Sequence, residues 1–139
     1  MFVNQVLAPF FWPFDTVLLP ILLGVPGQKG GRANYERVRK DVLRQLKQQG
    51  SVYCTTMIDF YRLGKGFPGS KLSTSGTAAE RVKQIESEWK TDICSTVPDL
   101  RPDLRFIPYL CLHSSSKRCC SVILWFLRRR LAVARLGPS

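Results

Sequence analysis

The feature that most constrains the fold is an uncharged segment, residues 52–58, that lies between two amphipathic helical segments. Its β-branched and aromatic residues favour a strand buried on both faces, as in a parallel sheet. The preceding segment, 34–49, predicts a helix, because apolar residues recur three or four positions apart and basic residues fill the other face. The apolar positions of that helix are Tyr35, Val38, Val42 and Leu46.

A second helix is expected to begin after Thr77, because Thr77 and Glu80 have the spacing of a capping box. A third strand is expected over 106–112, where Pro108 favours an edge position or a bulge. Toward the N-terminus the sequence predicts a short helix over 2–8 and a buried strand over 16–22.

Strands and helices therefore alternate along the chain. This order predicts an α/β fold with an open parallel sheet of about three strands and flanking helices. In such sheets ligands bind at the carboxyl ends of the strands. Asp59 ends the second strand and His113 ends the third.

Two interpretations of Asp59 stay open. A carboxylate at the end of a buried strand suits a divalent metal ion, because a rigid element orients it. The alternative is that Asp59 caps a turn or pairs with Arg62. His113 is a lone imidazole, which is more often structural than a ligand.

A glycine-rich loop before the first long helix is a weak candidate for phosphate binding. It contains Lys29, Gly30, Gly31 and Arg32. Exposed backbone N–H groups and two cations suit a phosphate, although the loop matches no nucleotide-binding motif and a flexible turn is the alternative. Lys65 and Lys71, in a second glycine-containing loop, are similar candidates.

The charge of the chain is concentrated at its end. The formal net charge is +11, and residues 114–139 carry six basic residues and no acidic one. Such a balance suits nucleic acid or anionic lipid as a partner, and residues 124–131 form a cationic segment with apolar positions. The single His and five Cys lack zinc-site spacing. The odd cysteine count suits a reducing, cytoplasmic location.

No membrane span is favoured in the first 25 residues. They contain no Lys or Arg, but Asp15 and three prolines interrupt the apolar run.

Four motifs in order resemble the bacterial domain-of-unknown-function family 4276, which looks Toprim-like. They are GGRANY (30–35), TMIDFY (56–61), GFPG (66–69) and RFIPY (105–109). The resemblance covers about residues 2–113. It implies a metal-dependent nucleic-acid enzyme that holds Mg²⁺ with a glutamate after the first strand and aspartates after a later one. It also implies an ATPase partner in defence-type operons. Asp59 is the acidic residue that carries over.

The N-terminus departs from the family pattern. The family has a strand ending in Glu-Gly-x-Thr-Glu before the residues that match 2–5, whereas this chain starts at Met1. We therefore expect a partial Toprim-like domain over 1–113. With one carboxylate it is expected to have little metal-dependent activity, because Mg²⁺ dehydrates reluctantly.

The second departure follows His113, where the family continues Glu-Phe-Glu-Ala-Leu-Leu-Phe-Ser-Asp. Plausible codons for that motif, shifted by one nucleotide, encode the residues found at 115–123. We therefore expect 114–139 to be a basic tail that is read out of frame. Such a tail is not expected to fill the place of the missing strand, so an unpaired, aggregation-prone edge is expected.

Two functions follow from the sequence. The first is a Toprim-like protein whose parent activity is metal-dependent phosphodiester chemistry, with this chain inactive. The alternative is a small basic, non-enzymatic protein that binds nucleic acid or anionic membrane through its arginine-rich tail.

Overall fold

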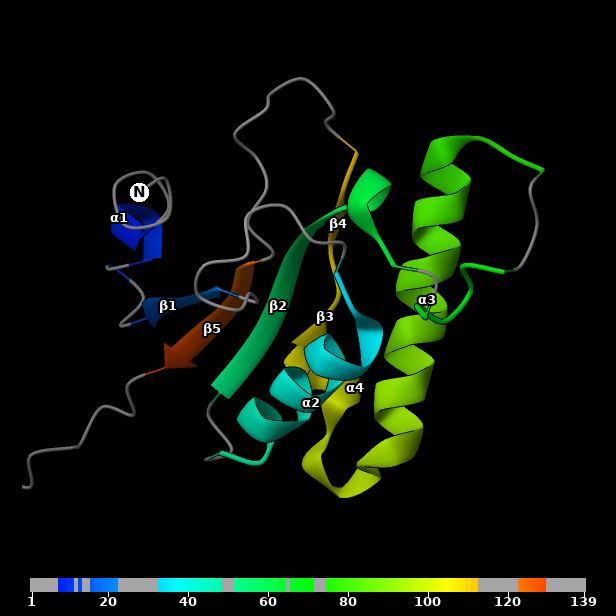
Figure 1. The fold of residues 1–139 in the computed structure, drawn as a ribbon. Coiled ribbons are helices and arrows are strands. Elements are labelled where there is room, and N and C mark those ends of the chain that lie inside the picture. The colour runs from blue at the N-terminus through cyan, green and yellow to red at the C-terminus, as the bar shows by residue number, and fades with distance from the viewer. Residues whose placement is uncertain are drawn as a thin grey trace, which may run out of the picture.

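The computed structural model describes residues 8–11, 13, 16–22, 33–48, 52–64, 66–71, 75–112 and 123–129. Its elements follow the order helix, strand, helix, strand, helix in the first two thirds of the chain (Figure 1). They are α1 (Ala8–Phe11), β1 (Thr16–Leu22), α2 (Tyr35–Leu46), β2 (Val52–Asp59), η3 (Phe60–Arg62), α3 (Ala78–Thr96), η4 (Pro98–Leu100), α4 (Pro102–Arg105), β3 (Phe106–Ile107), β4 (Leu110–Cys111) and β5 (Ile123–Arg129).

The strands form one sheet in the order β1-β5-β2-β3, and β4 also pairs with β2. β2 is parallel to β3 and β4 and antiparallel to β5, which is in turn antiparallel to β1. The strands expected from the sequence therefore all run in one direction. The predicted α/β class, with parallel strands and flanking helices, is confirmed.

The tail contributes a strand to this sheet, which corrects the expectation that it cannot fill a gap between neighbouring strands. β5 lies between β1 and β2 (Figure 1), and Leu127 is opposite both Leu18 and Tyr53. The prediction gave weight to the polar residues at 114–121 and to the arginine run. Strand pairing needs only backbone N–H donors and C=O acceptors. Residues 123–129, which follow those polar residues, provide them to β1 and β2. That the tail is read out of frame stays a prediction.

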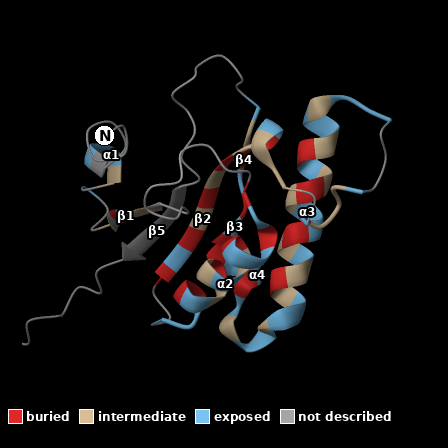
Figure 2. Ribbon diagram, in the orientation of Figure 1, coloured by how far each residue is buried: buried red, intermediate tan, exposed pale blue. Residues whose placement is uncertain are grey.

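β2 is buried on one face rather than on both, which is a second correction. Its residues alternate, with every second side chain, beginning at Val52, buried and those between them partly or largely exposed. Tyr53 is 39% exposed. Figure 2 shows the buried residues of α2 and α3 toward the sheet. Tyr, Thr and Met side chains are tolerated on a strand face that is partly exposed to solvent. A run without charged residues therefore does not show whether one face of a strand or both faces are buried.

The core lies between β2 and these two helices. Trp89 on α3 is fully buried, and its ring makes edge contacts with Tyr35, Phe67 and Phe106 at centroid distances of 6.3, 5.3 and 5.5 Å. Aromatic pairs in this geometry add to the apolar burial that holds the helices on the sheet.

Both long helices begin where the sequence predicts. The Asn34 side chain accepts a hydrogen bond from the Arg37 N–H at 3.3 Å. The capping box of Thr77 and Glu80 is present, and Glu80 Oε2 accepts from the Thr77 N–H at 2.7 Å. These contacts satisfy backbone donors that a helix start otherwise leaves unpaired.

The third predicted strand is interrupted at Pro108, as expected from its missing N–H, and forms β3 and β4. Thr56 on β2 bridges the interruption, because its Oγ1 accepts from the Tyr109 N–H at 3.1 Å. Residues 2–7 of the expected N-terminal helix lie outside the described residues, where α1 starts at Ala8. In the part of the chain that the structure describes, no helix combines the length and apolarity needed to cross a bilayer.

Candidate functional site at the carboxyl end of β2

Asp59 is the last residue of β2 and its carboxylate is held by its own chain. Oδ1 accepts a hydrogen bond from the Tyr61 N–H at 3.0 Å, which caps the η3 turn. Oδ2 lies 3.9 Å from Arg62 Nε. Of the two interpretations of Asp59, the turn cap with a nearby arginine is the one present in this geometry.

The segment after η3 contacts the start of α2. Ala33 donates its N–H to the Arg62 carbonyl, and Gly64 donates its N–H to the Ala33 carbonyl, both at 3.0 Å. A Cβ on Gly64 would lie 2.6 Å from the Ala33 carbonyl oxygen, so this approach requires glycine. Ala33 therefore lies beside the carboxyl end of β2.

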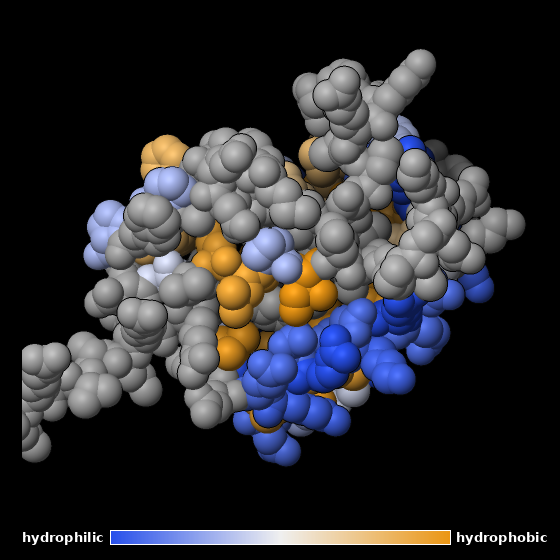
Figure 3. Space-filling model, turned by 60° about the vertical axis from the view of Figure 1, so that its left-hand side comes forward, coloured by the Kyte–Doolittle hydropathy of each residue, from blue (hydrophilic) through white to orange (hydrophobic). Residues whose placement is uncertain are grey.

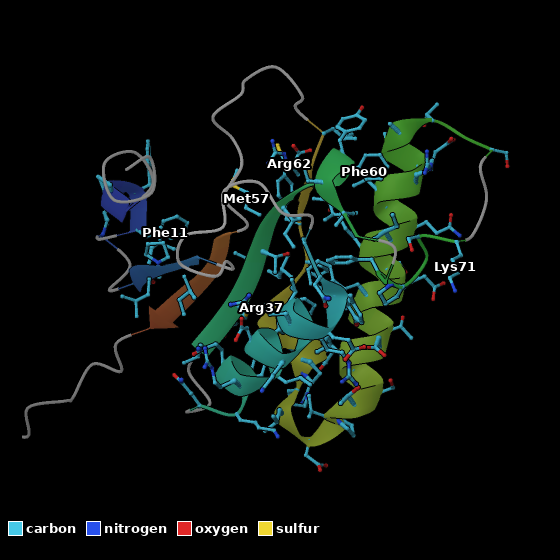
Figure 4. All side chains as sticks on the ribbon, in the orientation of Figure 1. Phe11, Arg37, Met57, Phe60, Arg62 and Lys71 are labelled. Atoms are coloured by element: carbon cyan, nitrogen blue, oxygen red, sulfur yellow. The ribbon has the colours of Figure 1, made fainter. Side chains whose placement is uncertain are left out.

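A pocket of about 420 Å³ opens beside this contact, between η3, the loop after it and α3. Two cations, Lys71 and Arg81, line it together with the rings of Phe60 and Tyr61. Figure 4 labels Phe60 beyond the end of β2 and Lys71 to the right of α3. We call it the carboxyl-edge pocket; its other lining residues are Leu63, Gly64, Ser70 and Ile85.

The Phe60 ring contacts one of these cations. The Arg81 guanidinium carbon lies 5.4 Å from the centre of the Phe60 ring, within the range of a cation–π contact. The Phe60 and Tyr61 rings meet edge to face at 5.3 Å. Because Tyr61 is 58% exposed, part of its ring is open to a ligand.

A second carboxylate reaches this end of the sheet from α3. Glu86 Oε1 accepts the Leu110 N–H of β4 at 2.7 Å. Burial raises the pKa of Glu86, and the hydrogen bond from Leu110 opposes that shift. This carboxylate therefore serves to anchor α3 to β4.

The magnesium ion that the Toprim-like resemblance implies does not fit these residues. Both oxygens of Asp59 face donors of their own chain, and Glu86 is used by β4. Across the residues that the structure describes, no three His, Cys, Asp or Glu side chains form a group that could hold a metal ion. Mg²⁺ needs near-octahedral oxygen ligands.

The structure describes some of the site residues predicted from the sequence and not others. Asp59 and Lys71 lie at the same end of the sheet, whereas Lys29, Gly30, Gly31, Arg32 and His113 fall outside the described residues. Sequence analysis missed Arg81, because a single arginine on an amphipathic helix carries no motif. Its position one turn after the Thr77 cap was the available signal.

Comparison with protein families gives a match over most of the chain. A family model described as Domain of unknown function (DUF4276) matches residues 1–115. The match ends just past His113, close to where the sequence motifs stop. No curated protein and no solved structure matches the chain.

Proposed function

The chain belongs to the DUF4276 family, a domain of unknown function, and on that premise we propose that it binds nucleic acid at the carboxyl-edge pocket. The observation that carries the proposal is that Lys71, Arg81 and the Tyr61 ring line one pocket. That pocket is at the edge of the sheet where α/β proteins bind their ligands.

The chemistry of the pocket matches the two parts of a nucleotide. Phosphate oxygens are neutralised by Lys and Arg. A base stacks on an aromatic ring, and each such contact contributes about 1–3 kcal/mol to the binding of single strands. The exposed part of Tyr61 offers that surface, and Arg81, which lines the pocket, is in cation–π contact with the Phe60 ring.

The proposed function is binding, and it includes no magnesium-dependent step, because Asp59 is held by Tyr61 and Arg62. The metal-dependent phosphodiester chemistry and the ATPase partner implied by the Toprim-like resemblance stay predictions for the family. A cytoplasmic location also stays a prediction.

The alternative partner for the tail, an anionic membrane, has less support. Ile123–Arg129 is paired along both of its edges, with β1 and with β2. A segment held in this way is not free to lie on a membrane as an amphipathic element.

The test is fluorescence anisotropy with a labelled thymidine dinucleotide. Lys71→Ala with Arg81→Ala should lower its affinity at least about tenfold, since each removes a phosphate contact. Tyr61→Ala should lower it about 5- to 100-fold through lost stacking. The matched control is Lys83→Ala with Lys90→Ala, two α3 lysines that do not line the pocket. Equal affinities of the pocket and control variants would contradict the proposal.

A further inference from the structure

A second concave surface lies on the outer side of α2. This groove, of about 850 Å³, is lined by Asn34, Glu36, Arg37, Arg39, Lys40, Leu43, Arg44 and Lys47. Hydrophilic side chains gather on one face of the molecule, beside a smaller apolar area (Figure 3). We call this surface the α2 groove.

Within the described part of the chain, three of its cations lie outside the ion pairs. Arg39 pairs with Asp92 at 2.8 Å and Arg44 with Asp41 at 3.2 Å. Among the described residues no ion pair involves Arg37, Lys40 or Lys47. Their spacing of three and seven residues places them along one side of the helix, over about 15 Å at 1.5 Å per residue.

The α2 groove and the carboxyl-edge pocket are neighbours through a backbone contact. Asn34 lines the groove and Gly64 lines the pocket. Ala33, directly before Asn34, accepts the Gly64 N–H at 3.0 Å. Each concavity thus has a lining residue at this contact or directly next to it.

We propose that the ligand is a single-stranded nucleic acid whose base enters the carboxyl-edge pocket and whose phosphates continue along the α2 groove. This inference rests on the proposed function and adds the substrate class. The two concavities share no lining residue, so a ligand that fills the pocket alone leaves the α2 groove unused. A single strand is required because the bases of a duplex are stacked on each other and do not reach the Tyr61 ring.

The inference predicts how affinity depends on length and salt. Each phosphate neutralised on a single strand contributes about −0.7 to the slope of log affinity against log salt. Removing two cations of the α2 groove should therefore make the slope shallower by about 1.4. The affinity for a ligand that reaches only the pocket should not change.

The experiment measures anisotropy with labelled thymidine oligonucleotides of two and twelve nucleotides. We expect the longer strand to bind at least about tenfold tighter. In Arg37→Gln with Lys40→Gln, this advantage should disappear while dinucleotide binding persists. The control, Lys83→Gln with Lys90→Gln, removes the same charge from residues that line neither concavity. All substituted side chains are at least partly solvent-exposed, and a thermal melt checks that each variant folds.

The outcomes separate the inference from its premise. Equal binding of both lengths, or a length advantage that survives in the α2 variant, would overturn the inference and leave a nucleotide pocket. A duplex of twelve base pairs that binds as tightly as the single strand would overturn the single-stranded assignment. If neither length binds, the proposed function itself is wrong.

Discussion

β2 and β1 belong to the same sheet, but they are held in it by different interactions. β2 lies under α2 and α3, where Val52, Cys54 and Ile58 join the hydrophobic core. β1 pairs with β5, and among the described side chains of residues 8–22 only Leu18 is buried. We call residues 33–112 the helical unit and α1, β1 and β5 the flank.

This difference teaches where the free energy of unfolding resides. Apolar burial and packing stabilise the helical unit. β1 has one buried residue among its described side chains. We therefore expect it to depend mainly on backbone hydrogen bonds to β5, which add about 0.5–1.5 kcal/mol each because water competes for the same groups. Regions with few buried apolar contacts open at lower free energy than the core. We therefore expect the flank to open while the helical unit stays folded.

The largest expected effect is on the reactivity of Cys54. Burial raises the pKa of this thiol to about 12, so the thiolate that reacts with alkylating reagents is about a thousandfold rarer at pH 8. Cys94 and Cys111 are half-buried and should react first, as mass spectrometry of alkylated peptides would show. Rapid native labelling of Cys54 would contradict a closed helical unit. Since folding favours the neutral thiol, its stabilising contribution is lost as the pH rises through about 12.

The next effect is on global stability. Trp89→Ala should lower the free energy of unfolding by about 3–5 kcal/mol, because it leaves a large cavity between the helices and the sheet. Urea denaturation measures the loss. Ile107→Ala, at a side chain that is 55% exposed, is the control and should cost less than about 1 kcal/mol. Similar losses in both variants would show that the core does not dominate.

A proline in β5 should separate the two regions. Leu127→Pro removes a backbone donor from a strand that is paired on both sides and costs the ladder about 1–3 kcal/mol. Amide exchange in β1 should then speed up about tenfold or more, while α3 keeps its protection. Leu131→Pro, beyond the end of β5, is the matched control. Equal loss of protection in α3 would mean that the sheet unfolds as one unit, which would break the comparison.

The smallest effect concerns the start of α3 and its pH dependence. Hydrogen bonds from the Thr77 backbone N–H and hydroxyl hold the pKa of Glu80 below its usual range. The stabilisation is therefore present above the ordinary carboxyl pKa and is lost as the pH falls through the lowered value. Thermal melts of the protein and of Glu80→Gln should converge as the pH is lowered. A difference that grows toward acid would reverse the sign.

Much of the helical unit could be predicted from local patterns. Helix spacing, the Thr77 cap and the uncharged run at β2 each depend on neighbouring residues, and each appears within a few positions of the expected bounds. Pro108 marked the interruption of the third strand for the same local reason.

The rest depended on contacts between distant segments. β5 could not be foreseen, because its partners lie far away in the sequence and its own arginines argued against burial. The carboxyl-edge pocket combines η3, a loop and Arg81 of α3, and no short motif spans them. The sequence placed Asp59 correctly at the carboxyl end of β2. Whether its carboxylate caps a turn or binds a metal ion depended on the positions of the Tyr61 N–H and of Arg62.

The pairing of β1 with β5 also sets an order for biosynthesis. Thr16 pairs with Arg129, almost at the other end of the sequence, so β1 leaves the ribosome long before its partner has been made. The helical unit has all its segments between these two strands and can fold while translation continues. Until β5 has been synthesised, the edge of β1 that pairs with it has no partner strand. Contacts between segments this distant in the sequence also form slowly. Chaperones that cover apolar strands would therefore act on β1 during the time needed to synthesise residues 23–129.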